Sequence, residues 1–140
     1  MASLHRNIPP PIHDAVDFSI QLPPYEQIRL ANGVEVYLVN MGAEDTLQIS
    51  WVFTAGNWYE MAKGTAAVTN YLLKNGTSRK TAFAINEYFD FYGAYLNRSC
   101  FTEFAEMTLH CLSRHAGELL PVVAELLTDS RFPESEWKIY

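Results

Sequence analysis

A run of alternating apolar and polar residues most restricts how this chain can fold. The apolar members are Leu47, Ile49, Trp51, Phe53 and Ala55. Successive side chains of a β-strand point to opposite faces, so the alternation predicts a strand with one covered face and one exposed face. The sequence therefore predicts a sheet that needs a covering layer on one side only.

Further segments are predicted to be strands. Asn32-Gly33 separates two short runs, residues 27–30 and 34–39, and favours a tight hairpin because both residues tolerate a positive φ. Strands are also expected around residues 94–100 and 104–112. In the second of these, every other residue is apolar and shares a face: Ala105, Met107, Leu109 and Cys111.

Two helices are predicted between the third and fourth strands. Residues 65–75 predict the first helix, with Thr65 able to cap its start and Gly76 able to end it. Residues 81–92 predict the second, with Gly93 as its stop. The apolar stripe of the second helix consists of Ile85, Tyr88, Phe89 and Tyr92.

A third helix is expected after the last strand, and a fourth helix opens at Phe132-Pro133-Glu134 because proline suits the first position of a helix. The residues of the third helix at core spacing are Leu119, Leu120, Val123, Leu126 and Leu127. The chain stops at Tyr140 inside the fourth helix. We therefore expect the domain to be truncated at its C-terminal side.

The order of these elements predicts an α+β fold, an antiparallel-rich mixed sheet covered by helices. Residues 1–25 contain Pro9-Pro10-Pro11 and Pro23-Pro24, which favour extended chain, so we expect an N-terminal strap there. Residues 26–140 are expected to form the N-terminal part of one domain.

Charge and composition exclude several classes of partner. The net charge of −6 provides no basic stripe for phosphates, so no nucleic-acid partner is expected. No apolar run approaches the roughly 20 residues of a membrane span, so no membrane insertion is expected. Two cysteines, Cys100 and Cys111, are too few for a disulfide scaffold and fit a reducing compartment. With no signal peptide visible, a cytoplasmic location is expected.

The first predicted helix carries the most specific signal. Residues 64–77 resemble the active-site helix of the insulinase, pitrilysin and mitochondrial processing peptidase family. In that family an H-x-x-E-H motif lies between a lead of small residues and an apolar run ending in Gly-Thr. Its two histidines hold zinc and its glutamate is the general base. Here the flanking Gly64-Thr65-Ala66 and Gly76-Thr77 are present.

The resemblance extends over most of the chain, from Leu30 to about Glu136. Outside the first helix it is carried by Asn32-Gly33-Val34, Ala55-Gly56 with Glu60, Gly93-Ala94, and Phe132-Pro133-Glu134. No single one of these is specific, and their order and spacing together make the resemblance. It implies the fold of an insulinase-like peptidase domain.

The same alignment implies that the catalytic motif is lost. Ala67 and Tyr71 occupy the two histidine positions, and Asn70 occupies the glutamate position. Alanine has no donor atom, and a phenol with a pKa near 10 is a poor zinc ligand at neutral pH. An amide does not take a proton from water as a carboxylate does. We therefore expect no metal, no cofactor and no peptide cleavage by this chain alone.

Three hypotheses remain open after this step. The resemblance implies a catalytically inactive subunit or half that pairs with a zinc-bearing peptidase subunit and helps enclose peptide substrates. The alternative is a structural subunit of a larger complex that kept the fold without proteolysis. A peptidase of different chemistry is a third and weaker hypothesis.

Aromatic residues are frequent at 14% of the chain, and three of them are candidates for peptide or subunit contacts: Trp58, Tyr59 and Tyr71. Packing in the core is the alternative interpretation of the same residues. A nucleophile–base pair from His110 and Cys111 is excluded, because neighbours on a strand point to opposite faces.

Overall fold

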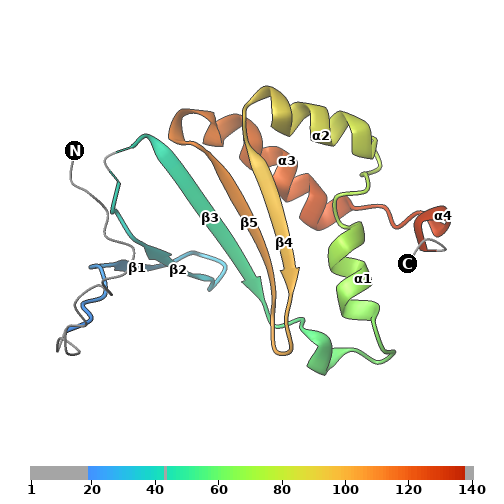
Figure 1. Ribbon diagram of the computed structural model, residues 1–140, viewed down its shortest axis with the longest axis horizontal. Coiled ribbons are helices and arrows are strands. Elements are labelled where there is room, and N and C mark those ends of the chain that lie inside the picture. The colour runs from blue at the N-terminus through green and yellow to red at the C-terminus, as the bar shows by residue number, and fades with distance from the viewer. Residues whose placement is uncertain (1–18, 43, 138–140) are drawn as a thin grey trace, which may run out of the picture. The chain divides into compact units, whose positions relative to one another are not determined.

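The computed structural model describes residues 19–42 and 44–137 of the chain (Figure 1). It divides into two compact units, Met1–Met41 and Gly42–Tyr140, and each is described by itself. Residues 19–25 have no regular secondary structure, and the rest of the predicted strap lies outside the described residues. The predicted domain boundary after residue 25 therefore stays a prediction.

The first unit contains the predicted hairpin. Strands β1 (Glu26–Arg29) and β2 (Glu35–Leu38) pair antiparallel. Gly33 has a φ of +87°, and the Leu30 amide donates to the Val34 carbonyl at 2.9 Å. The Asn32 side chain accepts a hydrogen bond from the Val34 amide at 3.2 Å. The turn therefore forms as predicted, because Gly33 adopts the positive φ that an Asn-Gly pair tolerates.

The second unit is built on a three-stranded antiparallel sheet. Its strands are β3 (Thr46–Phe53), β4 (Tyr95–Cys100) and β5 (Ala105–Leu112), in the order β3-β5-β4. Leu47 lies opposite Cys111, and Leu96 lies opposite Leu109, so apolar side chains line up on one face. This confirms the α+β fold with antiparallel pairing.

Helices cover that apolar face (Figure 1): α1 (Thr65–Leu72), α2 (Ala82–Phe91) and α3 (Ala116–Asp129). A short helix α4 (Glu134–Trp137) follows, and 3₁₀ turns η1 (Asn57–Tyr59) and η2 (Ser113–His115) precede α1 and α3. The core joins residues of β4, β5, α2 and α3, together with Ala94 just before β4: Ile85, Phe89, Ala94, Leu96, Met107, Leu109, Cys111, Leu119, Val122, Val123 and Leu126. The alternating run of β3 contributes Leu47 and Trp51 to its margin.

Three details of the predicted helices are wrong. Helix α1 ends at Leu72 and not near residue 75, and no side-chain cap comes from Thr65. In α3, Leu120 is 36% exposed while Val122 is buried. The buried stripe of α3 follows i, i+3, i+4 and i+7 from Leu119, so the residue directly after Leu119 is turned away from the core.

Within residues 19–42 and 44–137, no helix is long and apolar enough to cross a membrane.

Candidate functional site around helix α1

The approach to α1 is fixed by close contact with the turn that joins β4 to β5. A Cβ atom at Gly56 would lie 2.5 Å from the Phe104 amide nitrogen and from the Thr102 carbonyl oxygen, so only glycine fits there. The next amides donate to the same turn: Asn57 to the Phe101 carbonyl at 2.9 Å, and Trp58 to the Thr102 carbonyl at 2.8 Å. The turn η1 is therefore anchored to the sheet by its backbone.

The start of α1 is capped by a carboxylate from outside the helix. Glu60 accepts a hydrogen bond from the Gly64 amide at 2.9 Å with one oxygen and from the Ala66 amide at 3.1 Å with the other. A negative charge at the N-terminus of a helix also interacts favourably with the helix dipole. Glu60 is one of the residues that carry the family resemblance, but its position four residues before Gly64 does not predict that it caps the helix.

The three motif positions have different surroundings. Ala67 is half-buried and Tyr71 is 45% exposed, and their spacing of four places them on one face of α1. Asn70 is only 8% exposed, and its Nδ2 donates to the Ser99 carbonyl of β4 at 3.1 Å. The side chain at the general-base position of the motif thus holds the helix to the sheet.

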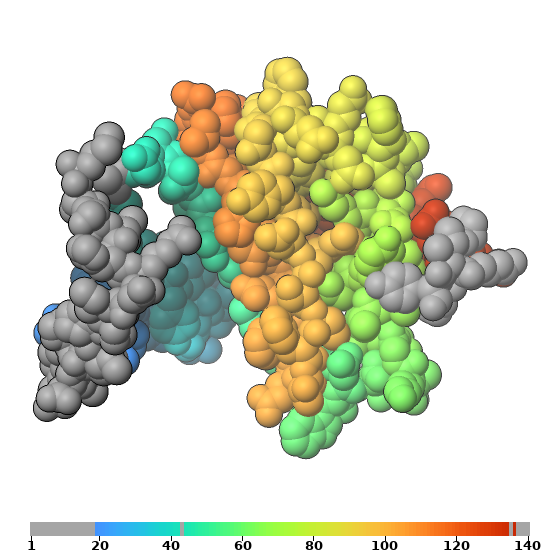
Figure 2. All heavy atoms as spheres, in the orientation of Figure 1, coloured from blue at the N-terminus to red at the C-terminus, as the bar shows by residue number. Residues whose placement is uncertain are grey.

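A positive charge lies beside Tyr71. The Arg98 guanidinium, from β4, donates to the Tyr71 carbonyl and lies 5.5 Å from the centroid of the Tyr71 ring. Lys74 follows the end of α1, and its ammonium lies 5.3 Å from the centroid of the Phe89 ring. Burial, and then the charge of Arg98, hold the pKa of Lys74 below its ordinary value. Figure 2 shows α1 (green) and β4 (gold) side by side at this surface.

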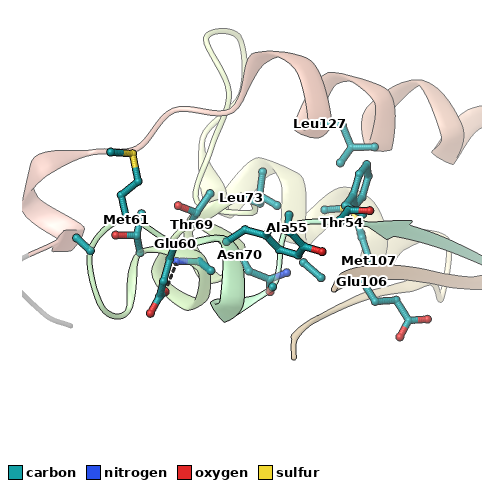
Figure 3. Close-up of a pocket in the computed structure, with 17 residues that line it drawn as sticks. Thr54, Ala55, Glu60, Met61, Thr69, Asn70, Leu73, Glu106, Met107 and Leu127 are labelled. Atoms are coloured by element: carbon teal, nitrogen blue, oxygen red, sulfur yellow. Dashed lines mark hydrogen bonds between the residues drawn. The ribbon is translucent and has the colours of Figure 1, made fainter. Parts of the chain in front are cut away.

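The other side of α1 borders an apolar pocket of about 660 Å³ (Figure 3). Thr65 and Thr69 of the helix line it, and so does Leu73, directly after the helix. The rest of its lining is Phe53, Thr54, Ala55, Gly56, Tyr59, Glu60, Met61, Ala62, Ala66, Asn70, Ala105, Glu106, Met107 and Leu127. Ala67 and Tyr71 do not line this pocket, so α1 separates an apolar side from a cationic side.

The three aromatic candidates are exposed side chains on two different elements. Trp58 is 71% and Tyr59 is 59% exposed on η1, and Tyr59 also lines the pocket. Tyr71 lies on α1 next to Arg98. Core packing is therefore wrong for these three residues, whereas Phe89, at 1% exposed, does pack in the core. Their role in binding stays a prediction.

The alternative catalytic residues are explained by packing. His110 stacks on Tyr95 with ring centroids 4.9 Å apart, while Cys111 points into the core, which confirms that the two face opposite sides. Both cysteines are free thiols, and burial raises the pKa of each above its ordinary value. A raised pKa leaves less thiolate at neutral pH, so neither is an activated nucleophile.

The residues at the motif positions do not fit a zinc ion. Ala67 provides no ligand atom, the Asn70 amide is bonded to the Ser99 carbonyl, and the Arg98 guanidinium beside Tyr71 repels a dication. In the part of the chain that the structure describes, there is no group of three or more His, Cys, Asp or Glu side chains able to hold a metal ion.

Comparison with known proteins finds similar sequences and a similar solved structure. No family model matches the chain. An uncharacterized zinc protease of Rickettsia bellii is 27% identical over 110 residues. A probable mitochondrial-processing peptidase subunit beta of Arabidopsis thaliana is 26% identical over 128 residues. These matches cover 77% and 90% of this chain.

A solved structure has the same fold. The peptidase M16 inactive domain from Pseudomonas fluorescens matches 79% of this chain with a TM-score of 0.75 and 25% sequence identity. The chain spans about a quarter of the length of these proteins: 27% of the Rickettsia protein, 24% of the Arabidopsis protein and 28% of the Pseudomonas chain.

Proposed function

The chain belongs to the insulinase-type (M16) peptidase family, and from this premise we propose that it is a catalytically inactive subunit or half. It pairs with a zinc-bearing relative and helps to enclose and bind peptide substrates. The observation that carries the proposal is the set of side chains on α1. Ala67, Asn70 and Tyr71 stand where the family motif has two zinc ligands and a general base.

The contacts made by these residues support the loss of the metal centre. Asn70 uses its amide protons to bind β4 through the Ser99 carbonyl. A carboxylate at this position has no proton to donate at neutral pH and would face that carbonyl oxygen. The neighbouring Arg98 adds a permanent positive charge. The site is therefore organised around contacts that oppose both a zinc ion and an ionised general base.

Peptide binding and pairing are supported by the surface near α1. Strand β4 is at the edge of the sheet of the second unit, and an edge strand can pair with an extended peptide. Trp58 and Tyr59 are large exposed aromatic side chains, a type enriched at the energetic centres of interfaces. One relative is named as a subunit of a processing peptidase, and one solved relative is described as an inactive domain.

Co-purification from the native source tests this function. We expect a relative with an intact H-x-x-E-H motif in the purified complex, with zinc bound to that partner and none in stoichiometric amount on this chain. One zinc per chain in the isolated protein, after dialysis against a weak chelator, would contradict the proposal. Recovery within a large assembly that lacks any zinc-bearing relative would favour the structural-subunit alternative.

Restoring the motif provides a second test. The triple variant Ala67→His, Asn70→Glu and Tyr71→His is expected to show weak zinc binding at most and no robust peptide cleavage. The new imidazole at position 71 would lie near the Arg98 guanidinium, and the new carboxylate would face the Ser99 carbonyl. Efficient cleavage by the triple variant would show that the surrounding residues are still those of an active site.

A further inference from the structure

The turn of the hairpin β1–β2 contains a pair of residues with a chemistry of its own. Asn32 is followed by Gly33 and Asn75 by Gly76, while every other asparagine of the chain is followed by a residue with a side chain. In an Asn-Gly pair the glycine nitrogen can attack the side-chain carbonyl carbon of the asparagine, because no Cβ atom blocks the approach. The two pairs are alike in sequence, so the structure around them decides which one reacts.

The side-chain carbonyl of Asn32 accepts a hydrogen bond within the turn. The Val34 amide donates to Asn32 Oδ1 at 3.2 Å. A donor aimed at a carbonyl oxygen stabilises the negative charge that the oxygen acquires when a nucleophile attacks the carbonyl carbon. The contact that shapes the turn therefore also activates the carbon next to Gly33 in the chain.

The attacking nitrogen lies beside a cation. Arg29 Nε donates to the Gly33 carbonyl at 3.3 Å, and a Cβ atom at Gly33 would lie 3.9 Å from Arg29 Nη2. A guanidinium stays protonated in proteins, and a positive charge this close favours the loss of a proton from the Gly33 amide. That proton is bound to the Leu30 carbonyl, with nitrogen and oxygen 2.9 Å apart, so this bond has to open first.

Opening the turn requires little free energy. Asn32 and Gly33 are exposed, and so is every residue of β1 and β2 except the half-buried Val36. A two-stranded hairpin is marginally stable by itself, and segments with few buried apolar contacts open most easily. The Gly33 amide is thus released by opening of the turn alone.

The surroundings of the second pair oppose the same reaction. Asn75 is half-buried, and its Nδ2 donates to a carboxylate oxygen of Glu136 at 3.3 Å, which places a negative charge beside the group to be attacked. Gly76 is buried, and its carbonyl accepts from the Arg131 amide at 2.9 Å. A Cβ atom at Gly76 would lie 3.1 Å from the Lys80 carbonyl oxygen. The backbone of this pair is therefore held in place, and its side chain lies beside the wrong charge for the reaction.

We propose that Asn32-Gly33 is a site of covalent self-modification, at which the folded chain deamidates while Asn75-Gly76 is protected. The Gly33 nitrogen forms a bond to the Asn32 side-chain carbonyl carbon, the bond from that carbon to Nδ2 breaks, and the amide proton leaves with Nδ2 as ammonia. Water then opens either of the two ring carbon–nitrogen bonds of the succinimide. The products are aspartate and isoaspartate at position 32. The reaction is independent of peptide binding and of any partner.

The modification changes the hairpin in two ways. Both products add a negative charge beside Arg29, and aspartate keeps the turn because Asp-Gly suits a hairpin as Asn-Gly does. Isoaspartate carries the main chain through the side-chain carboxyl, so the backbone gains one atom between positions 32 and 33. The extra atom disturbs the pairing of Arg29 with Glu35, because the turn sets the register of a hairpin.

Incubation of the full chain in mildly alkaline buffer, followed by peptide mapping with mass spectrometry, tests this inference. We expect Asn32 to be converted about ten-fold faster than Asn75, the effect of one or two additional hydrogen bonds that must open at Asn75. In urea the two asparagines should be converted at similar rates, because the folded contacts are gone. Equal rates in the folded chain, faster conversion of Asn75, or the same preference for Asn32 in urea would each overturn the inference.

Three variants test the chemistry of the turn. Asn32→Gln should abolish conversion at position 32, since the longer side chain would have to close a larger and slower-forming ring. Arg29→Gln keeps a donor for the Gly33 carbonyl but removes the charge, and it should slow conversion of Asn32 several-fold. Arg114→Gln removes an equal charge from η2 and should leave the rate unchanged.

The Arg29→Gln variant also separates chemical activation from a structural role. If Arg29 only stabilises the hairpin, its removal opens the turn more often, and Asn32 is converted faster, toward the rate in urea. A rate equal to or above that of the unchanged chain would therefore overturn the activation of Asn32-Gly33 by its folded surroundings. A slower rate in Arg29→Gln, with an unchanged rate in Arg114→Gln, supports it.

Discussion

Helices α1 and α2 cover the same sheet and differ in what determines them. Helix α2 is capped by its own Thr81, whose side chain accepts from the Ala84 amide at 3.2 Å, and the chain turns at Gly93 with a φ of +59°. Helix α1 depends on other elements at both ends. Glu60 caps its start, and Arg98 of β4 binds a carbonyl near its end.

The side chains of the two helices are used differently as well. Ile85 and Phe89 of α2 are fully buried in the core. On α1, the Asn70 side chain is hydrogen-bonded to β4, and Tyr71 is 45% exposed beside a cation. The helix that carries the candidate site is therefore the one held by polar contacts from its neighbours, while the other is held by its own sequence signals and by apolar burial.

The largest expected effect contrasts one aromatic residue from each helix. Phe89→Ala should lower the free energy of unfolding by about 3–5 kcal/mol, because it empties a fully packed position. Tyr71→Ala should cost less than about 1.5 kcal/mol, since the ring is 45% exposed, and should weaken peptide capture in the assembled complex. Urea unfolding and peptide affinity measure the two effects. A Tyr71→Ala loss as large as that of Phe89→Ala would remove the distinction.

Asn70→Asp tests the tie between α1 and β4. The variant loses the donor to the Ser99 carbonyl and buries a carboxyl group, so we expect a loss of about 2–3 kcal/mol. Asn97→Asp is the matched control, because Asn97 is an exposed residue of the same strand β4. Similar melting temperatures for the two variants would show that the Asn70 amide does not hold the helix.

The two helices also differ in their N-terminal caps, and removing a cap should change stability by a smaller amount. Glu60→Ala should destabilise the protein by about 1 kcal/mol, comparable to Thr81→Ala in α2. Thr65→Ala, at the position that the sequence alone favoured as the cap of α1, should have almost no effect. Chemical denaturation of the three variants measures these changes in stability. A larger loss of stability for Thr65→Ala than for Glu60→Ala would mean that Thr65, and not Glu60, caps α1.

The smallest expected effect is a change in the pKa of Lys74. Arg98→Gln should raise the pKa of Lys74 toward its ordinary value of 10.5, although burial will keep it below that value. Because the pKa of Lys74 is lowered in the folded state, the unfolded state binds more protons just below pH 10.5, and stability rises with pH there. Arg98→Gln should flatten this rise. NMR titration of labelled lysine side chains follows Lys74 directly, and an unchanged pKa would mean that the two cations are not coupled.

The regular elements could be predicted from local patterns of the sequence. The Asn32-Gly33 turn, the alternation in β3 and the stripe of α2 each rest on residues within one element, where steric preference and periodicity act directly. The motif positions Ala67, Asn70 and Tyr71 come from the resemblance to the family, aligned on Gly64-Thr65-Ala66 and Gly76-Thr77, and their assignment stays a prediction.

Tertiary structure alone decided what these positions contact. Glu60 caps α1 from across a loop, Asn70 reaches Ser99 across 29 residues, and Arg98 meets Tyr71 across 27. Such contacts depend on how the sheet and helix pack, and no local spacing encodes them. The sequence by itself predicts, through its resemblance to the family, that Ala67, Asn70 and Tyr71 replace the catalytic side chains, and only the packing of α1 on β4 decides that Arg98 lies beside Tyr71.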